Sequence, residues 1–247
     1  MTPSIGKEFM RLTRYTHLPP SAESQGLPQP PLELPFPPEA RLITLPQPKD
    51  LRLPGADLAE TIVQRRSLRR YAEQALSLEE LAYLLWLTQG VKKVTDRPAT
   101  FRTVPSAGAR HAFETYLLVN RVDGLEPGLY RYLALEHALI LLDDDPGLTE
   151  AAYHAAHDQR MIETAAVNFL WVAVLERMAY RYGERGYRYL HLDAGHVCQN
   201  LYLAAESIQC GVVGIAAYDD EGMNSVLGLD GEELFVVYLA ALGKKMT

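Results

Sequence analysis

The sequence has few cysteines and no long apolar run. Its 247 residues include two cysteines, Cys198 and Cys210, with no C-x-x-C pair, which argues against a disulfide framework or a zinc ribbon. No stretch reaches the roughly 18 apolar residues that a membrane span needs, and the first 20 residues lack the apolar core of a signal peptide. We therefore expect a cytoplasmic protein with no membrane partner.

Basic residues are also in deficit. Lysine and arginine number 24 against 31 acidic residues, which gives a net charge of −7 at pH 7. Because nucleic acids and anionic membranes bind basic faces, we expect neither as the main partner. With 48% hydrophobic residues, the chain is long enough to bury a full core of its own.

Prolines are abundant, but in one region only. Residues 19–54 hold 11 of the 16 prolines, which disfavours regular helix and central strand alike. A disordered tail is one interpretation, whereas interleaved apolar residues favour an ordered strap along the domain or a partner. We divide the chain into a proline-rich extended N-terminal strap, residues 1–55, and a folded domain, residues 56–247. The interleaved residues are Leu32, Leu34, Phe36, Leu42, Ile43 and Leu45.

Regular structure is predicted from Asp57 onward. Capping boxes at Asp57 and Ser77 predict one helix that runs into a group of arginines and a second helix that ends at Gly90. The uninterrupted apolar run at 165–175 predicts a strand buried on both faces at the centre of a sheet. The other predictions are an antiparallel meander of strands at 113–122, 129–133 and 138–142, helices at 149–157, 187–207 and 221–229, a short strand or loop at 211–218 and a last strand at 233–242.

Four arginines crowd around one serine between the first two predicted helices: Arg65, Arg66, Ser67, Arg69 and Arg70. Guanidinium groups hold phosphate oxygens through charge-assisted, often bidentate hydrogen bonds, and a serine hydroxyl adds a neutral donor. If the segment is extended, Arg65, Ser67 and Arg69 share one side while Arg66 and Arg70 point away. The alternative is a solvated basic face or a set of ion pairs, and the segment alone favours neither interpretation.

Longer stretches resemble a known family. The R-x-S-x-R motif at 65–69 is similar to the phosphate motif of the FMN-dependent nitroreductase superfamily. "VPSAGARHAFETYLLV" resembles the family's flavin-contacting loop and following strand, and "DAGHVCQNLYLAAESIQCGVVGIAAYDD" resembles its core helix with the loop beside the ring. "GLYRY", "RTVPSAGARH" and "YGERGYRYLHLDAGH" are similar to the SagB-type subfamily, the flavin oxidases of thiazole and oxazole peptide maturation.

This resemblance implies an α+β, nitroreductase-like fold: a central mixed, mostly antiparallel sheet flanked by helices, in an intertwined homodimer with FMN at the subunit interface. Residues 56–247 would be the FMN-binding domain. The resemblance implies that Arg65, Ser67 and Arg69 hold the phosphate and ribityl oxygens, with Arg69 also near the N1 and C2 oxygen edge of the flavin. The other implied cofactor-binding residues are Arg66, then Pro105, Ser106, Ala107 and Gly108 from the partner subunit, Gly214, Ile215, Ala216 and Ala217 beside the ring, and Lys244 and Lys245 near the phosphate.

Two departures from the family pattern bear on the chemistry. Close relatives often carry a proline and paired glycines where this chain has residues 214–217. The azoline oxidases resemble one another in a Lys-Tyr pair proposed for proton removal, and the matching positions here are Arg181 and Tyr182. Because arginine keeps its proton beyond pH ~12, it cannot act as the base. Both residues are our catalytic candidates, with the proton role assigned to Tyr182.

The expected function is hydride transfer through flavin N5 in a ping-pong cycle, by an NAD(P)H-dependent reductase of nitro compounds and quinones or by an azoline-type peptide dehydrogenase. The alternative is a flavin-binding or scaffold subunit of a peptide-maturation complex with little turnover. We expect no metal site, because His154 and His157 lack a third ligand at suitable spacing. Asp193 is expected only to pack within its helix.

Overall fold

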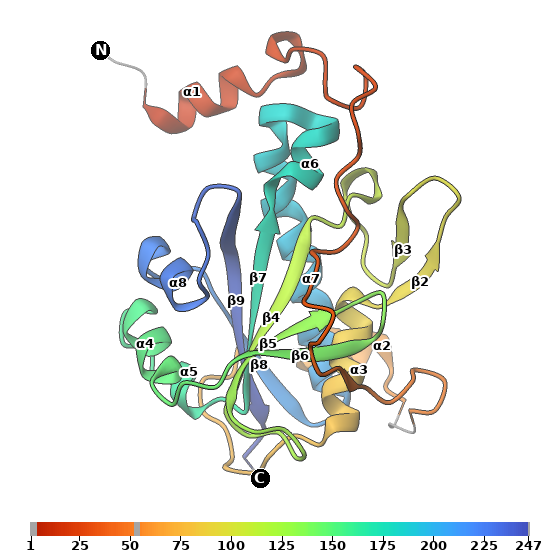
Figure 1. Cartoon of the computed structure of the whole chain (residues 1–247). Coiled ribbons are helices and arrows are strands. Elements are labelled where there is room, and N and C mark those ends of the chain that lie inside the picture. Colours follow the sequence, from red (N-terminus) through yellow and green to blue (C-terminus); the bar gives the residue numbers. More distant parts are fainter. Residues whose placement is uncertain (1–3, 52–54, 247) are drawn as a thin grey trace.

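A seven-stranded sheet forms the middle layer of the structure, a computed structural model that describes residues 4–51 and 55–246 (Figure 1). Its order is β1-β6-β5-β4-β7-β9-β8, and every neighbouring pair is antiparallel. Among the described residues, parallel pairing is limited to isolated bridges such as Ser67 with Val212. The predicted α+β fold with a mostly antiparallel sheet is confirmed. The strands are β1 (Ile43–Thr44), β4 (Phe113–Val119), β5 (Gly128–Leu133), β6 (Ala138–Asp143), β7 (Val167–Val174), β8 (Cys210–Ile215) and β9 (Leu234–Lys244).

Strands β4 and β7 lie in the interior of the sheet, and every residue of both is buried. The apolar run that predicted β7 has no polar face because helices cover both sides of the sheet. β4 takes the central position that we assigned to β7, and β7 pairs with it along its length. Strands β4, β5 and β6 form the predicted meander.

Helices pack on both faces of the sheet (Figure 1). One core cluster lies under α3 and α7 and includes Leu84, Trp171 and Leu201, while the other lies under α4, α5 and α8 and includes Leu170 and Met223. Trp171 and Leu170 are neighbours in β7, so their side chains enter opposite layers. The helices are α2 (Leu58–Gln64), α3 (Leu78–Gln89), α4 (Leu148–Ala155), α5 (Met161–Thr164), α7 (Gly186–Ser207) and α8 (Asp220–Val226).

The two capping boxes form where they were predicted. The Asp57 side chain accepts the backbone N–H of Glu60 at 2.9 Å, and Ser77 and Glu80 cap α3 reciprocally. α2 ends at Gln64, so the arginines follow the helix in extended conformation. Several elements were not predicted: helix α1 (Ile5–Leu12), strand β1, the hairpin of β2 (Val91–Val94) with β3 (Thr100–Arg102), helix α5, and helix α6 (Leu175–Tyr182), which follows β7 without a break. Short 3₁₀ turns are η1 (Tyr15–His17), η2 (Ala107–Ala109) and η3 (Gly183–Arg185).

The proline-rich segment crosses the surface of its own domain. From α6 it descends past the sheet in Figure 1, and its backbone is held by side chains and main chain of the domain. Arg177 Nε donates to the Pro31 carbonyl at 2.8 Å, and the Arg131 guanidinium donates to the Pro35 carbonyl at 3.0 Å. The segment then adds β1 to the edge of the sheet and buries Leu45.

The first part of the predicted strap is not extended. Residues 5–12 form α1, and residues 4–18 contain no proline to prevent a helix. Parts of the predicted strap, residues 1–3 and 52–54, lie outside the described residues. Across the part of the chain that is described, no helix combines the length and the apolar character that crossing a membrane requires.

Candidate active site

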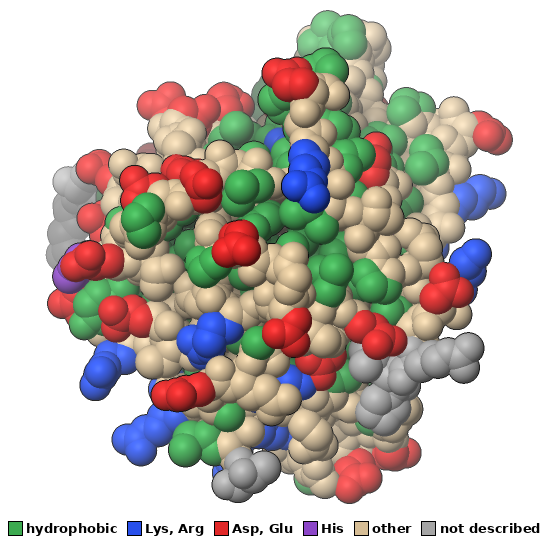
Figure 2. Space-filling view, turned by 60° about the horizontal axis from the view of Figure 1, so that its bottom comes forward, with side chains coloured by type: hydrophobic (Ala, Val, Ile, Leu, Met, Phe, Trp, Pro, Cys, Tyr) green, Lys and Arg blue, Asp and Glu red, His purple; other side chains and the backbone are tan. Residues whose placement is uncertain are grey.

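The basic bend, residues 65–70, runs beside strand β8. Leu68 N–H donates to the Val212 carbonyl at 2.8 Å, and its side chain packs so closely on Gly211 that a Cβ there would lie 2.3 Å from Leu68 Cδ2. The bend lies near the C-terminal end of β9, since Ala72 N–H donates to the Lys244 carbonyl at 3.0 Å. Figure 2 brings the bottom of Figure 1 forward, and Lys and Arg side chains gather along its lower left.

Two side chains of the bend meet at Tyr202 of α7. The Arg65 Cζ atom lies 5.2 Å from the centre of the Tyr202 ring, and Ser67 Oγ lies 3.0 Å from the Tyr202 hydroxyl. That hydroxyl also accepts the backbone N–H of Gly214 at 2.8 Å. Arg65 and Ser67 therefore share one side of the extended bend, and Tyr202, which we did not predict as a site residue, ties them to the end of β8.

The arginines of the bend have no acidic partners. Among the described residues, none of Arg65, Arg66, Arg69 and Arg70 lies within ion-pair distance of a carboxylate, and all but Arg65 are exposed. The ion-pair interpretation of this cluster is therefore not what the structure shows. Four cations held this close repel one another, and an anion at this place interacts favourably with each of them.

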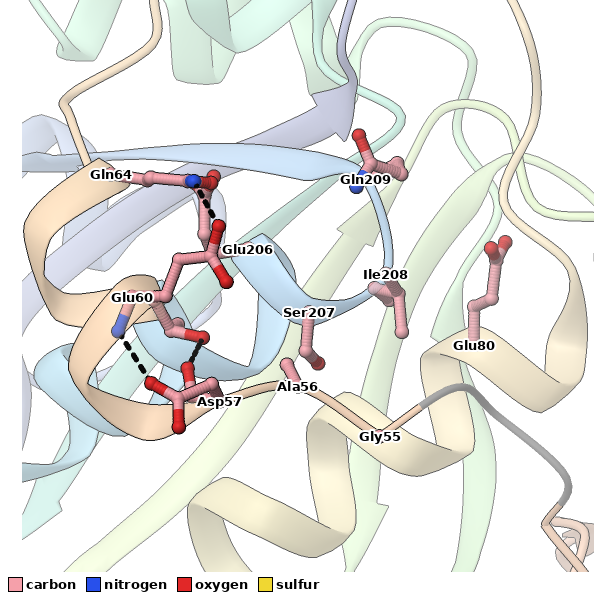
Figure 3. Close-up of a pocket in the computed structure, with 11 residues that line it drawn as sticks. Gly55, Ala56, Asp57, Glu60, Gln64, Glu80, Glu206, Ser207, Ile208 and Gln209 are labelled. Atoms are coloured by element: carbon pink, nitrogen blue, oxygen red, sulfur yellow. Dashed lines mark hydrogen bonds between the residues drawn. The ribbon is translucent and has the colours of Figure 1, made fainter.

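The two C-terminal lysines differ from the arginines in having partners. Lys244 pairs with Glu80 and Lys245 with Glu206. Both glutamates line the pocket of Figure 3, a cavity of about 430 Å³ that Asp57 also lines. A phosphate at the bend would compete with these carboxylates for the lysines.

Potential metal ligands are not grouped. Within the ranges 4–51 and 55–246, no set of three His, Cys, Asp or Glu side chains could hold a metal ion. His154, one of the histidines that we considered, has its Nδ1 at 2.8 Å from Asp158 Oδ1 on an exposed surface.

The predicted flavin loop, residues 105–108, is built on a buried carboxylate. Ser106 Oγ donates to Asp193 Oδ2 at 2.6 Å, and Ala107 N–H lies 3.2 Å from each carboxylate oxygen. Asp193 is only 4% exposed, and this burial raises the pKa of its carboxyl group, against the lowering effect of the two donors. Ser106 Oγ also accepts the His111 N–H at 2.9 Å. Asp193 thus positions this loop, a role beyond the packing that we expected.

Gly108 brings the same loop against both catalytic candidates. Its φ is +58°, and a Cβ at this position would lie 2.5 Å from Tyr182 Oη and 3.0 Å from Arg181 Cδ. Both the left-handed backbone and the close approach therefore require glycine. Arg181 Nε lies 3.3 Å from Glu23 Oε2 of the proline-rich segment. Burial raises the pKa of Tyr182 above its ordinary value.

The third predicted group, residues 214–217, divides between two faces. Gly214 faces α7 and Tyr238, whose hydroxyl would lie 2.4 Å from a Cβ at this position. The Ile215 side chain is 3% exposed and packs in the opposite core layer, so only its backbone is available on the α7 side. Ala216 is exposed, and the Ala217 carbonyl accepts a hydrogen bond from Gln159 at 2.7 Å.

One chain does not bring the two main groups together. The loop at 105–108 is anchored at Asp193 and the basic bend at Tyr202, nine residues further along α7. At a rise of 1.5 Å per residue, these anchors are about 13 Å apart along the helix axis. The two groups therefore lie apart along α7.

Two known proteins are similar to this chain in sequence. The chain is 35% identical over 201 residues to MJ1384 of Methanocaldococcus jannaschii, which carries a provisional nitroreductase name; the match covers 80% of this chain and 97% of that protein. It is 30% identical over 133 residues to the trifolitoxin-processing protein TfxB of Rhizobium leguminosarum bv. trifolii. That match covers 52% of this chain and 36% of TfxB.

Solved structures share the fold. A Ralstonia eutropha protein with a provisional nitroreductase name matches with a TM-score of 0.67 and 25% identity, over 90% of this chain and all of that one. An Anabaena variabilis protein, also provisionally a nitroreductase, has a TM-score of 0.65 and 32% identity over 77% of this chain, but this match spans only 38% of that protein. A chain of the Escherichia coli microcin synthetase McbBCD complex, solved with truncated pro-MccB17 bound, has a TM-score of 0.62 at 20% identity, over 99% of this chain and 93% of that chain.

The family assignment rests on most of the chain. The model of the nitroreductase family matches residues 62–244, which span the basic bend, the loop at 105–108, both catalytic candidates and the last strand. The proline-rich segment precedes the matched region. The chain belongs to the nitroreductase family.

Proposed function

We propose that this protein is an FMN-dependent oxidoreductase that transfers hydride in two half-reactions. The observation that carries the proposal is the basic bend, whose four arginines have no acidic partner in the described chain. The family of the chain supports an oxidoreductase. A structure of the same fold from Desulfovibrio desulfuricans, a provisionally named nitroreductase, was solved with FMN.

The donor set of the bend fits the flavin's phosphate. Arg65 and Arg69 would hold its oxygens through charged hydrogen bonds, and Ser67 would add a neutral donor. When bound, FMN supplies the two-electron chemistry by accepting hydride at N5 and passing it on to a second substrate. The loop of Ser106, Ala107 and Gly108, positioned by Asp193, would approach the ring from the partner subunit, with the Ala107 N–H itself bound to Asp193.

Tyr182 would supply the proton. Its hydroxyl is protonated at neutral pH, as in an ordinary tyrosine, so it can donate to a substrate that has just been reduced. Arg181 stays charged and cannot remove a proton from carbon. This pair therefore favours the NAD(P)H-dependent reduction of nitro compounds or quinones.

An azoline-type peptide dehydrogenase of SagB type is the second candidate. The similarity to TfxB favours it, because that relative is named for the processing of a peptide toxin, and the fold shared with McbBCD is compatible with it. A subunit of a peptide-maturation complex with little turnover would also retain these features. Reduction by a nicotinamide nucleotide distinguishes the reductase from both.

We further propose a homodimer with FMN at the subunit interface. The loop at 105–108 and the basic bend have their anchors apart on α7, and apolar side chains beside them are exposed. Burial of these side chains in a partner would contribute about 25 cal/mol per Å² of apolar surface. They are Leu58 (64% exposed), Ile62 (51%) and Val63 (83%) on α2 and Leu192 (59%) on α7.

The test is FMN retention. We expect purified protein to be yellow, to release FMN on denaturation, and to be bleached under argon by NADH or NADPH. The double variant Arg65→Gln/Arg69→Gln should lose the cofactor, whereas Arg14→Gln/Arg41→Gln removes equal charge from exposed sites elsewhere and should keep it. A wild-type protein that cannot be loaded with FMN, or equal affinity in the two double variants, would contradict the proposal.

A further inference from the structure

A second arginine cluster lines a cavity of about 570 Å³ on another part of the molecule. The cavity lies between the proline-rich segment, the β2–β3 hairpin and the end of α6. Its cationic side chains are Arg97 from the hairpin, Arg110 from the residues that follow the 105–108 loop, and Arg181. None of these belongs to the basic bend.

Arg110 is the unusual member of this cluster. It is 9% exposed, and its Nε atom is fully buried without a hydrogen-bond partner. Its guanidinium faces the Tyr180 ring, with Cζ 5.8 Å from the ring centre, and the charges of Glu23 and Arg181 lie nearby. Burial lowers the pKa of Arg110, against the opposing effect of Glu23. Because a largely buried guanidinium that forms no hydrogen bond or ion pair with a described residue is unfavourable, this position is suited to an anion in the cavity that Arg110 lines.

The charge of the lining indicates which anion. Three arginines face two carboxylates, Glu23 and Asp96, which leaves a single positive charge. A carboxylate carries one negative charge, whereas a phosphate monoester carries about 1.5 to 2 at neutral pH. Glu23 already lies 3.3 Å from Arg181, so the site accommodates a carboxylate from the protein itself. Both side chains of this pair remain about 40% exposed, which makes the contact easy to displace.

The cavity also lies next to the catalytic candidates Arg181 and Tyr182. Gly108 lines it, and a Cβ on Gly108 would lie 2.5 Å from the Tyr182 hydroxyl. We propose that this cavity binds the carboxylate of an anionic substrate, with Arg110 as its anchor, Arg181 as a second donor, and Glu23 as the internal group that the substrate displaces. That the bound anion is a substrate rests on the proposed function, whereas the anion site itself does not. The carboxylate could belong to a small aromatic acid or to the C-terminus of a peptide.

The binding test uses the full chain and calorimetric titration, so it does not depend on flavin or turnover. One arm compares 4-nitrobenzoate with its uncharged methyl ester, and the other compares N-acetyl-triglycine with its C-terminal amide. At least one free acid should bind and its neutral analogue should bind at least about tenfold more weakly, since a charged hydrogen bond contributes about 1.5–3 kcal/mol. The arm that responds identifies the source of the carboxylate.

Variants separate this site from a general charge effect. Arg110→Gln should weaken acid binding about tenfold or more. Glu23→Gln should tighten it several-fold because the internal competitor is gone, and a gain of binding cannot arise from misfolding. Glu39→Gln, which removes an exposed carboxylate of the same segment, should leave binding unchanged. Failure of both acids to bind, equal binding of acid and neutral analogue, or no gain in Glu23→Gln would overturn the inference. Loss of FMN in Arg65→Gln/Arg69→Gln with acid binding intact would still support it.

Discussion

Two groups of arginines in this protein have opposite surroundings. The basic bend presents Arg66, Arg69 and Arg70 to solvent beside β8, and its arginines form no ion pair with a carboxylate among the described residues. Under the proline-rich segment, Arg131 and Arg177 are 5% and 3% exposed, and both are hydrogen-bonded to the backbone that crosses them. A buried arginine that saturates backbone carbonyls holds structure together, whereas an exposed cluster without partners is available to a ligand.

The buried group explains how a proline-rich segment stays ordered. Arg177 Nη2 lies 2.6 Å from Glu114 Oε1, and both side chains are 3% exposed. The same Glu114 oxygen accepts the Leu34 N–H at 2.9 Å, so the ion pair is also the anchor of the segment. Proline removes backbone donors, and the carbonyls that remain are satisfied here by arginine side chains.

The largest effect is expected from breaking this buried pair. Arg177→Met leaves Glu114 buried without its cation, which should lower the free energy of unfolding by about 3–5 kcal/mol. Urea denaturation measures the change. The double variant Arg177→Met/Glu114→Leu removes both charges and should recover part of the loss, while the Leu34 N–H and the Pro31 carbonyl still lack their partners. If Arg177→Met lowers the free energy of unfolding by less than about 1 kcal/mol, the buried arginines contribute no more to stability than an exposed ion pair does.

A pH dependence of stability should come from the same region. Burial, with the neighbouring Glu136 and Glu114, raises the pKa of Glu33 to about 8 from a usual value of 4.5. Between these values the folded state keeps a proton that the unfolded state has lost, so stability should fall as pH rises from 4.5 to 8. The loss should be about 2–4 kcal/mol.

Glu33→Gln cannot lose this proton, so the pH-dependent loss should be much smaller in this variant. Melting curves at pH 5 and pH 8 measure it, and Glu39→Gln, an exposed change in the same segment, should behave like the wild type. An equal pH response in Glu33→Gln and the wild type would assign the titration to another group.

In the basic bend, by contrast, substitutions should affect FMN binding strongly and stability little. Arg65→Gln should weaken FMN binding about 10- to 100-fold, because a hydrogen bond to a charged group contributes about 1.5–3 kcal/mol, and it should change stability by less than about 0.5 kcal/mol. Flavin fluorescence on titration of the apoprotein measures the affinity. Arg66→Gln, expected to point away from Arg65 and Ser67, should lose less. If Arg66→Gln loses more FMN affinity than Arg65→Gln, the predicted arrangement of side chains on alternate sides of the bend is wrong.

The smallest effect is expected from Lys245. This lysine lies near the bend but is paired with Glu206, and the pair is partly exposed. Lys245→Gln should change stability by less than about 1 kcal/mol and FMN affinity less than about threefold. A loss as large as that of Arg65→Gln would show that the lysine leaves Glu206 to hold the phosphate.

Prediction from sequence succeeded where the cause is local. The capping boxes at Asp57 and Ser77 act within one helical turn, and the alternation that aligns Arg65 with Ser67 requires only two residues. It missed α6, because the apolar run of β7 leads directly into the helix without a turn residue. It also missed α1, since we extended the proline-rich character to residues that contain no proline.

By itself, the sequence determined the longer strands of the main sheet, most of the helices, the family resemblance and the grouping of four arginines, because each depends on residues close together in the chain. Only the tertiary structure decided which charges have partners. Arg177 meets Pro31 and Glu114, and Asp193 meets Ser106, across 63 to 146 residues of chain. Such contacts depend on how the sheet and α7 bring distant segments together, which no local pattern records.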